Sequence, residues 1–258
     1  MIGVFDSGSG GMSVLREILK VLPGQSYVYY ADNAFCPYGE KTAEFITERS
    51  IAISGALLDK GVQIIVVACN TATSAAIAAL RREYPQIRFI GMEPAIKPAA
   101  LGTESGVIGV LATPGTLKGE KYLEIKEMYS NKIKIEEHAG EGFVELVENG
   151  VLDGPQAEET VRRSLQPLLE KGADRIVLGC THYPFLSEVI SRIAGPSVKV
   201  IDPAPAVARH LLEVLEEEGI PVEDPSAPGD IQVIASGDPS SAERILSIIL
   251  DTNKHNDK

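Results

Sequence analysis

Cysteine is scarce in this sequence: 258 residues contain three, and no two of them form a CxxC pair. An odd number without paired spacing argues against a disulfide framework and for a reducing compartment. The chain opens with "MIGVFDSG", which has no basic segment ahead of an apolar run, so we expect no signal peptide. The longest apolar runs, such as "IIVVA", are far too short to span a bilayer. These absences predict a cytoplasmic protein with no membrane partner.

Positively charged residues are fewer than negatively charged ones. The chain carries 24 Lys and Arg against 36 Asp and Glu, for a formal net charge of -12. Nucleic-acid surfaces need clustered cations, so we expect no nucleic-acid partner. A small anionic ligand remains compatible, because a local site can be positive inside an acidic protein. With 44% hydrophobic and 23% charged residues, the composition is that of a soluble protein with one large or two smaller domains.

The usual nucleotide-binding signatures are missing from the glycine-rich stretch "FDSGSGGMS". No Gly-Lys-Ser/Thr follows it, and Ser13 stands where the last glycine of GxGxxG belongs. Such a turn still exposes N–H groups that suit a carboxylate or a phosphate. Two structural alternatives stay open, namely helix capping by Asp6 and tight strand–helix packing at the glycines.

Short β-branched runs alternate with amphipathic helical patterns along the whole chain. The runs are continuously apolar, as expected for strands buried on both faces of a parallel sheet. This alternation predicts an α/β fold. The predicted strands are "IGVF", "YVYYA", "IIVVA", "IRFIG", "VIGVL", "IKIEE", "RIVLG", "VKVID" and "IQVIA".

Three segments of the first half of the sequence have weakly similar counterparts in the second half, in the same order. The matched pairs are "IGVFDSG" with "IGVLATPG", "IIVVACNT" with "RIVLGCTH", and "FIGMEPA" with "KVIDPAPA". Three matches in register predict two similar three-layer α/β half-domains with mostly parallel sheets and the active site in the cleft between them. We place the first domain at residues 1–94 and 207–258, and the second at residues 95–206.

Two cysteines occupy equivalent positions of this repeat. Cys69 and Cys180 each follow an apolar strand and are predicted to precede a helix. A helix N-terminus favours a thiolate, and His182 could promote deprotonation of Cys180 or relay its proton. Two activated thiols suit a reaction that needs an acid and a base on opposite faces of one carbon.

Three other interpretations of the cysteines stay open. Each thiol could be a small buried apolar group, which is the commonest fate of a free cysteine. Cys36, Cys69, Cys180 and His182 could bind zinc, but structural zinc sites use closely spaced pairs, so we expect no metal. A Cys–His acyl-transfer site would explain one thiol and leave the other idle.

Small polar residues flank both thiols. Asn70, Thr71 and Thr181 offer an amide and two hydroxyls that suit the α-carboxylate and α-ammonium groups of an amino acid. Thr113 and Thr116 offer further hydroxyls in the second half.

Two more segments contain candidate site residues. "FCPYGEK" is a turn in which Tyr38 either packs or contacts a ligand, and "ELVENG" places Glu148 at the end of a helix. A solvated surface position is the alternative for Glu148.

Taken together, "GVFDSGSGG", "PYGEK", "ACNTAT" and "LGCTHYP" resemble, in this order and spacing, the cofactor-independent glutamate racemases of the aspartate/glutamate racemase superfamily. The resemblance covers residues 2–206. It implies two-base racemisation of glutamate for peptidoglycan without PLP, metal or nucleotide. Members are often homodimers, and some respond to a cell-wall precursor. A racemase for aspartate or another small acid, and a non-catalytic amino-acid sensor or binding module, stay open as alternatives.

The resemblance also implies roles for individual residues. Cys69 and Cys180 would be the two bases, Asp6 and His182 would assist them, and Glu148 matches a glutamate that is sometimes given a supporting role. The implied substrate-binding residues are Asp6, Ser7, Pro37, Tyr38, Gly39, Asn70, Thr71, Thr113, Thr116, Thr181 and His182. The chain departs from the family where many members have a cysteine and two prolines before the glutamate; here these positions hold Gly140, Glu141 and Glu145. Ser9 replaces a residue that is often larger and apolar, and Cys36, beside the Pro-Tyr-Gly stretch, is predicted to be sensitive to oxidation.

Overall fold

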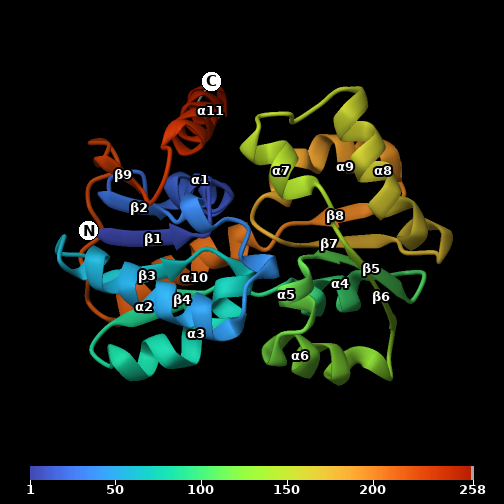
Figure 1. The fold of residues 1–258 in the computed structure, drawn as a ribbon, viewed down its shortest axis with the longest axis horizontal. Coiled ribbons are helices and arrows are strands. Elements are labelled where there is room, and N and C mark those ends of the chain that lie inside the picture. Colours follow the sequence, from blue (N-terminus) through green and yellow to red (C-terminus); the bar gives the residue numbers. More distant parts are fainter. Residues whose placement is uncertain (257–258) are drawn as a thin grey trace. The chain divides into compact units, whose positions relative to one another are not determined.

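The computed structural model describes residues 1–256, and its side-chain surroundings extend to residue 251. The chain forms two compact units, one of Met1–Met92 with Ala204–Lys258 and one of Glu93–Pro203 (Figure 1). The two-domain division drawn from the sequence, with boundaries after residues 94 and 206, stays a prediction, and residues 257–258 lie outside the described part. In the described part of the chain, no helix has the length and apolar character to cross a bilayer.

The first unit is built on a five-stranded sheet in the order β4-β3-β1-β2-β9, and every neighbouring pair is parallel. All four residues of β3 and all five of β1 are buried, as the continuously apolar runs predict. The strands are β1 (Ile2–Asp6), β2 (Tyr27–Ala31), β3 (Ile64–Val67), β4 (Arg88–Gly91) and β9 (Ile231–Ala235).

Helices cover this sheet in two layers. Helix α1 packs against α10 and α11, whereas α2 packs against α3 (Figure 1). Right-handed crossovers place these two groups on opposite faces of the sheet. The elements are α1 (Met12–Val21), η1 (Asn33–Phe35), η2 (Tyr38–Glu40), α2 (Ala43–Leu58), α3 (Asn70–Glu83), α10 (Ala204–Glu217) and α11 (Ser240–Asn256).

The second unit has a four-stranded sheet in the order β6-β5-β7-β8, again with parallel pairs only. Its strands are β5 (Val107–Ala112), β6 (Lys134–Ala139), β7 (Arg175–Gly179) and β8 (Lys199–Ile201). Helix α8 packs against α9, and α4 packs against α6. The helical elements are α4 (Ile96–Gly102), α5 (Pro114–Leu117), α6 (Glu120–Ser130), α7 (Phe143–Glu148), α8 (Pro155–Glu170), η3 (Tyr183–Leu186) and α9 (Ser187–Ala194).

The repeat seen in the sequence is confirmed by the sheet orders. Strands β4-β3-β1-β2 of the first unit correspond one by one to β8-β7-β5-β6 of the second. In each unit the second strand (β2 or β6) pairs with one side of the first strand (β1 or β5). The third strand (β3 or β7) then pairs with the other side of that first strand. This reversal is the topological switch point, where α/β sheets bind their ligands outside the carboxyl ends of the strands. The α/β class and all nine predicted strands are therefore confirmed.

Candidate active site

The first switch point brings Asp6 and Cys69 together. Strands β1 and β3 are paired up to Phe5 and Val67, and the N–H of Ala68 donates to Phe5 O at 2.8 Å. Asp6 ends β1, and Cys69 follows β3 by two residues. The motifs "FDSG" and "ACNT" therefore meet because their strands are neighbours and parallel.

Cys69 is the N-cap residue of α3. It has extended backbone angles (φ −129°, ψ 120°), and its Sγ accepts the N–H of Ala72 at 3.4 Å. Ser7 Oγ lies 3.9 Å from the same sulfur, and the cysteine is only 5% exposed. A backbone donor at an α-helix N-terminus stabilises negative charge, so this position favours the thiolate form.

Asn70 follows the cysteine and is 3% exposed. Neither its side-chain nitrogen nor its side-chain oxygen has a hydrogen-bond partner within the described structure. An unsatisfied buried amide is costly, and in native proteins it calls for a specific explanation. A polar ligand beside Cys69 would supply the missing partners.

The glycine-rich loop holds Asp6 in a fixed position. The Asp6 carboxylate is fully buried, and its Oδ2 accepts the N–H of Gly8 at 2.9 Å. The hydroxyl of Tyr29 donates to Gly8 O at 2.8 Å. A Cβ at Gly11 would lie 2.6 Å from Asp6 Cβ, so only glycine allows this close packing.

Tyr38 is buried, and its hydroxyl donates to Asp32 Oδ2. Burial raises the pKa of Tyr38 far above its ordinary value, and the hydrogen bond to Asp32 together with the charges of Asp32 and Cys69 adds to this rise, which Arg49 partly offsets. Tyr38 therefore stays protonated, and its one proton is committed to Asp32. The neighbouring Pro37 and Gly39 are half-buried.

Sequence reasoning missed the acid and the cation that support Tyr38. Arg49 binds Asp32 in a bidentate fashion, with Nε 2.9 Å from Oδ2 and Nη2 2.5 Å from Oδ1. A signal was available, because Asp32 directly follows β2 just as Ser7 directly follows β1.

The second switch point presents Cys180 in the same way. Ala112 of β5 pairs with Gly179 of β7, and Thr113 and Cys180 are the next residues of the two strands. Cys180 is 7% exposed. One expectation needs correction: the element after Cys180 is the short 3₁₀ helix η3, which starts at Tyr183. The helix N-terminal effect that applies to the first thiol therefore does not apply here in the same form.

Cys180, His182 and Glu148 form a chain of side-chain contacts. The sulfur lies 3.8 Å from His182 Nδ1, and His182 Nε2 lies 2.7 Å from Glu148 Oε1. The histidine is 1% exposed, and the Glu148 side chain is 20% exposed. Glu148 ends α7, where the helix dipole disfavours an acid, so the imidazole contact compensates its position. The open alternative of a solvated surface acid is wrong for this residue.

Aromatic packing sets the position of this chain of contacts. The ring of Tyr183 packs edge-on against Phe143 with centroids 4.9 Å apart, which joins η3 to α7. A Cβ at Gly140 would lie 2.5 Å from the Tyr183 hydroxyl. The glycine that stands where many family members carry a cysteine is therefore required by the position of Tyr183.

The candidate threonines of the second unit lie in two places, at the start of α5 and beside Cys180. Thr113 caps α5 by accepting the N–H of Thr116 at 3.3 Å, and the two hydroxyls lie 3.0 Å apart. Thr181 is buried next to Cys180. The capping contact gives Thr113 a structural role whether or not it also contacts a ligand.

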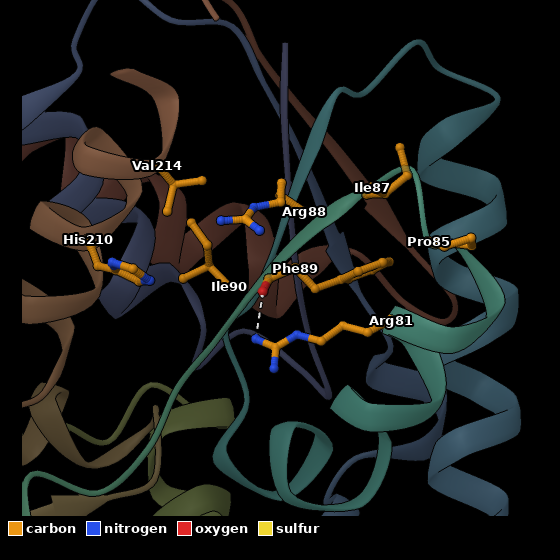
Figure 2. A pocket seen from close by; sticks show the side chains of 8 residues that line it. All are labelled: Arg81, Pro85, Ile87, Arg88, Phe89, Ile90, His210 and Val214. Atoms are coloured by element: carbon orange, nitrogen blue, oxygen red, sulfur yellow. Dashed lines mark hydrogen bonds between the residues drawn. The ribbon is translucent and has the colours of Figure 1, made fainter. Parts of the chain in front are cut away.

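A separate pocket of about 490 Å³ lies in the first unit, between α3, the edge strand β4 and α10 (Figure 2). Arg81, Arg88 and His210 line it together with the apolar side chain of Ile90. Arg81 Nη2 donates to Phe89 O at 3.1 Å, drawn as a dashed line in Figure 2. The pocket lining includes neither Ser7 nor Ala72, which contact the Cys69 sulfur.

The chain matches known proteins over most of its length. The model of the Asp/Glu/Hydantoin racemase family matches residues 2–211. A glutamate racemase from Methylococcus capsulatus is 47% identical over 248 residues, which are 96% of this chain and 91% of the relative.

Two solved structures share the fold. The Escherichia coli glutamate racemase, in complex with L-glutamate and the activator UDP-MurNAc-ala, is 36% identical with a TM-score of 0.86, covering 97% of this chain and 94% of that one. The Francisella tularensis glutamate racemase, in complex with D-glutamate, is 28% identical with a TM-score of 0.82, covering 97% and 93%.

The fold is the α/β fold of the glutamate racemases with which the chain aligns. The chain belongs to the Asp/Glu/hydantoin racemase family and is an amino-acid racemase.

Proposed function

We propose that the enzyme interconverts L- and D-glutamate. The observation that carries this proposal is the equivalence of Cys69 and Cys180, two buried thiols at the switch points of two units with the same strand order. The names of the curated relatives and the glutamate enantiomers in the two solved neighbours support glutamate as the substrate.

The mechanism uses the two thiols as a pair. One cysteine removes the α-proton as a thiolate, and the other donates a proton as a thiol to the opposite face of the same carbon. The resulting thiol and thiolate then serve the reverse reaction. This requires one ionised and one protonated cysteine at the same time, which predicts a bell-shaped pH profile.

A different group assists proton transfer at each thiol. The Ala72 N–H directed at Cys69 favours its thiolate, and the imidazole of His182 can take or return the proton of Cys180. Glu148 orients the imidazole and stabilises its protonated form, as a carboxylate does in other acid–base relays.

The α-proton of an amino acid is weakly acidic, so the developing negative charge must be stabilised in the transition state. Preorganised N–H and hydroxyl donors achieve this most effectively in a site that excludes water. The unsatisfied amide of Asn70 and the buried hydroxyls of Thr71 and Thr181 are the donors we assign to substrate.

The test is incubation with L-glutamate in D2O without added cofactor, following optical rotation and α-deuterium uptake. We expect both signals for the wild type, and loss of racemisation for Cys69→Ala and for Cys180→Ala. Racemisation of aspartate but not glutamate would reassign the substrate. Binding without exchange would favour the sensor alternative and refute the two-thiol mechanism.

We further propose that the product supplies peptidoglycan synthesis. The cytoplasmic location and the homodimer stay predictions, and light scattering after size exclusion measures the second of these.

A regulatory role is favoured by the basic pocket of Figure 2. Arg88 is paired with Glu217 and Glu218, and His210 lies 3.4 Å from Glu213, but Arg81 has no acidic partner among the residues described. We propose that the pocket accepts an anionic effector of the nucleotide class printed for the Escherichia coli neighbour. Calorimetric titration with UDP-MurNAc-Ala should show binding that Arg81→Met removes and Arg82→Met, on the same helix but outside the pocket, retains. Equal binding by both variants would refute the assignment.

A further inference from the structure

Asp32 is a buried carboxylate outside the motifs assigned to the site. Its side chain is fully buried, and burying a charge is costly unless it is paired and hydrogen-bonded. The two oxygens accept the Tyr38 hydroxyl and two N–H groups of Arg49. The backbone N–H of Asp32 donates to Asp6 O at 3.0 Å, so the residue is also tied to the neighbouring strand end.

Arg49 joins this carboxylate to the segment that carries Tyr38. Its guanidinium lies 4.5 Å from the centre of the Phe35 ring, and Phe35 packs edge-on against Phe45 at 5.5 Å. The bidentate pair and the stacked ring fix the guanidinium in one plane. Arg49 thus holds α2 against Asp32 and Phe35, and it reaches Tyr38 through the carboxylate of Asp32.

Tyr38 lies between the ion pair and the segment of the thiol, because η2, which begins at Tyr38, packs against α3, which Cys69 caps. Tyr38 and Cys69 belong to the same buried cluster, and the negative charges of Asp32 and Cys69 both act on the Tyr38 hydroxyl. Two further titratable groups lie near this ion pair. Tyr30 of β2 acts on Arg49, and Asp6, at the end of β1, accepts the backbone N–H of Asp32. Arg49 is the only cation among these named groups, so its removal leaves Asp32 as an uncompensated negative charge on Tyr38, the residue on which the charge of Cys69 also acts.

We propose that Arg49 is a positioning residue for Cys69: it neutralises Asp32 and holds the Tyr38 ring, so that the thiolate forms without a facing negative charge. The proposal rests on the proposed role of Cys69 as a base. It adds two residues, Asp32 and Arg49, that no motif of the family resemblance contained.

The test measures the pH dependence of Cys69 alkylation by iodoacetamide, read by peptide mass with Cys180 of the same molecule as reference. For Arg49→Met we expect the Cys69 rate at pH 7 to fall about threefold or more relative to Cys180, with its titration midpoint moved to higher pH. Asp32→Asn, which leaves the cation, should shift the midpoint the opposite way. The Asp32→Asn/Arg49→Met double variant should return toward wild type, and Arg49→Lys should lie between.

Arg192→Met is the matched control, because it removes an arginine paired with Asp153 and Glu158 in the other unit. An unchanged Cys69 profile in folded Arg49→Met and Asp32→Asn proteins would overturn the proposal. If Arg49→Met fails to fold, the sign of the Asp32→Asn shift decides. Alkylation of Cys69 needs no turnover. A wild-type enzyme that does not racemise glutamate would therefore refute the proposed function, whereas the effect of Arg49 on the Cys69 thiol would still be measured.

Discussion

His182 and Glu148 are joined by a 2.7 Å contact between Nε2 and Oε1, although 34 residues separate them in the sequence. The contact depends on where α7 ends and on how Tyr183 packs against Phe143. It pairs an acid at an unfavourable helix terminus with an imidazole, and in the proposed mechanism Glu148 is the outer member of a relay to Cys180.

This relay gives the first prediction. His182→Asn should lower kcat/KM by about a hundredfold, because it removes the group that exchanges a proton with the thiol. Glu148→Gln keeps a hydrogen-bond acceptor but loses the charge that stabilises imidazolium, and should lower kcat/KM by about tenfold.

The measurement is circular dichroism of each enantiomer over time, in both directions. Because enantiomers are equally abundant at equilibrium, each variant must lose the same factor of kcat/KM in both directions. Glu145→Gln, on the same short helix, is the control. A Glu148→Gln protein with wild-type kcat/KM would remove Glu148 from the mechanism.

Much of this arrangement could be predicted from the sequence. Buried parallel strands are visible as continuously apolar runs, and the three repeated segments predict equivalent strand positions, which the sheet orders confirm. The position of each thiol at a strand end follows from the same pattern, because apolar residues stop where the chain leaves the sheet.

Long-range side-chain contacts could not be predicted in this way. Nothing local distinguishes Arg49 from any other helical arginine, since its partner lies 17 residues earlier. The 3₁₀ form of η3 was also missed, because apolar periodicity over four residues does not separate 3₁₀ from α geometry.

A second prediction concerns the trade between stability and function at Asn70. Asn70→Ala should raise the free energy of unfolding by about 1 kcal/mol, because it removes a buried amide with no partner. The same change should lower kcat/KM, because substrate loses that amide. Urea unfolding and racemisation kinetics measure the two effects.

Ser74→Ala is the matched control for Asn70. Its hydroxyl is also buried without a partner, on the same helix α3, but it does not follow a strand end. We expect a gain in stability without loss of activity. A fall in stability for Asn70→Ala would show that the amide is satisfied in the free enzyme.

The third prediction tests the glycine that the family resemblance left unexplained. Gly140→Ala should destabilise the protein by about 1–3 kcal/mol, because the new Cβ would overlap the Tyr183 ring. It should also lower kcat, since Tyr183 holds the segment that carries His182. Gly102→Ala, whose Cβ would meet nothing closer than 3.6 Å, is the control for thermal denaturation. Combining Gly140→Ala with Tyr183→Leu should recover part of the lost stability, and a failure to do so would refute the steric explanation.

The last prediction concerns acid stability. Burial alone would raise the pKa of Asp174, but hydrogen bonds from Thr103 and from the backbone of Glu104 and Ser105, with the charge of Arg175, hold it below its usual value. A carboxyl with a lowered pKa in the folded state contributes stability at pH values above its unfolded pKa, near 3.8, and that contribution disappears as the pH falls through the folded value. Asp174→Asn should therefore be less stable than wild type at pH 6, and the difference should narrow toward pH 3. Urea unfolding across this range measures it, with the exposed Asp230→Asn as control. A constant difference at every pH would show that the hydrogen-bond geometry, and not the charge of Asp174, stabilises the turn.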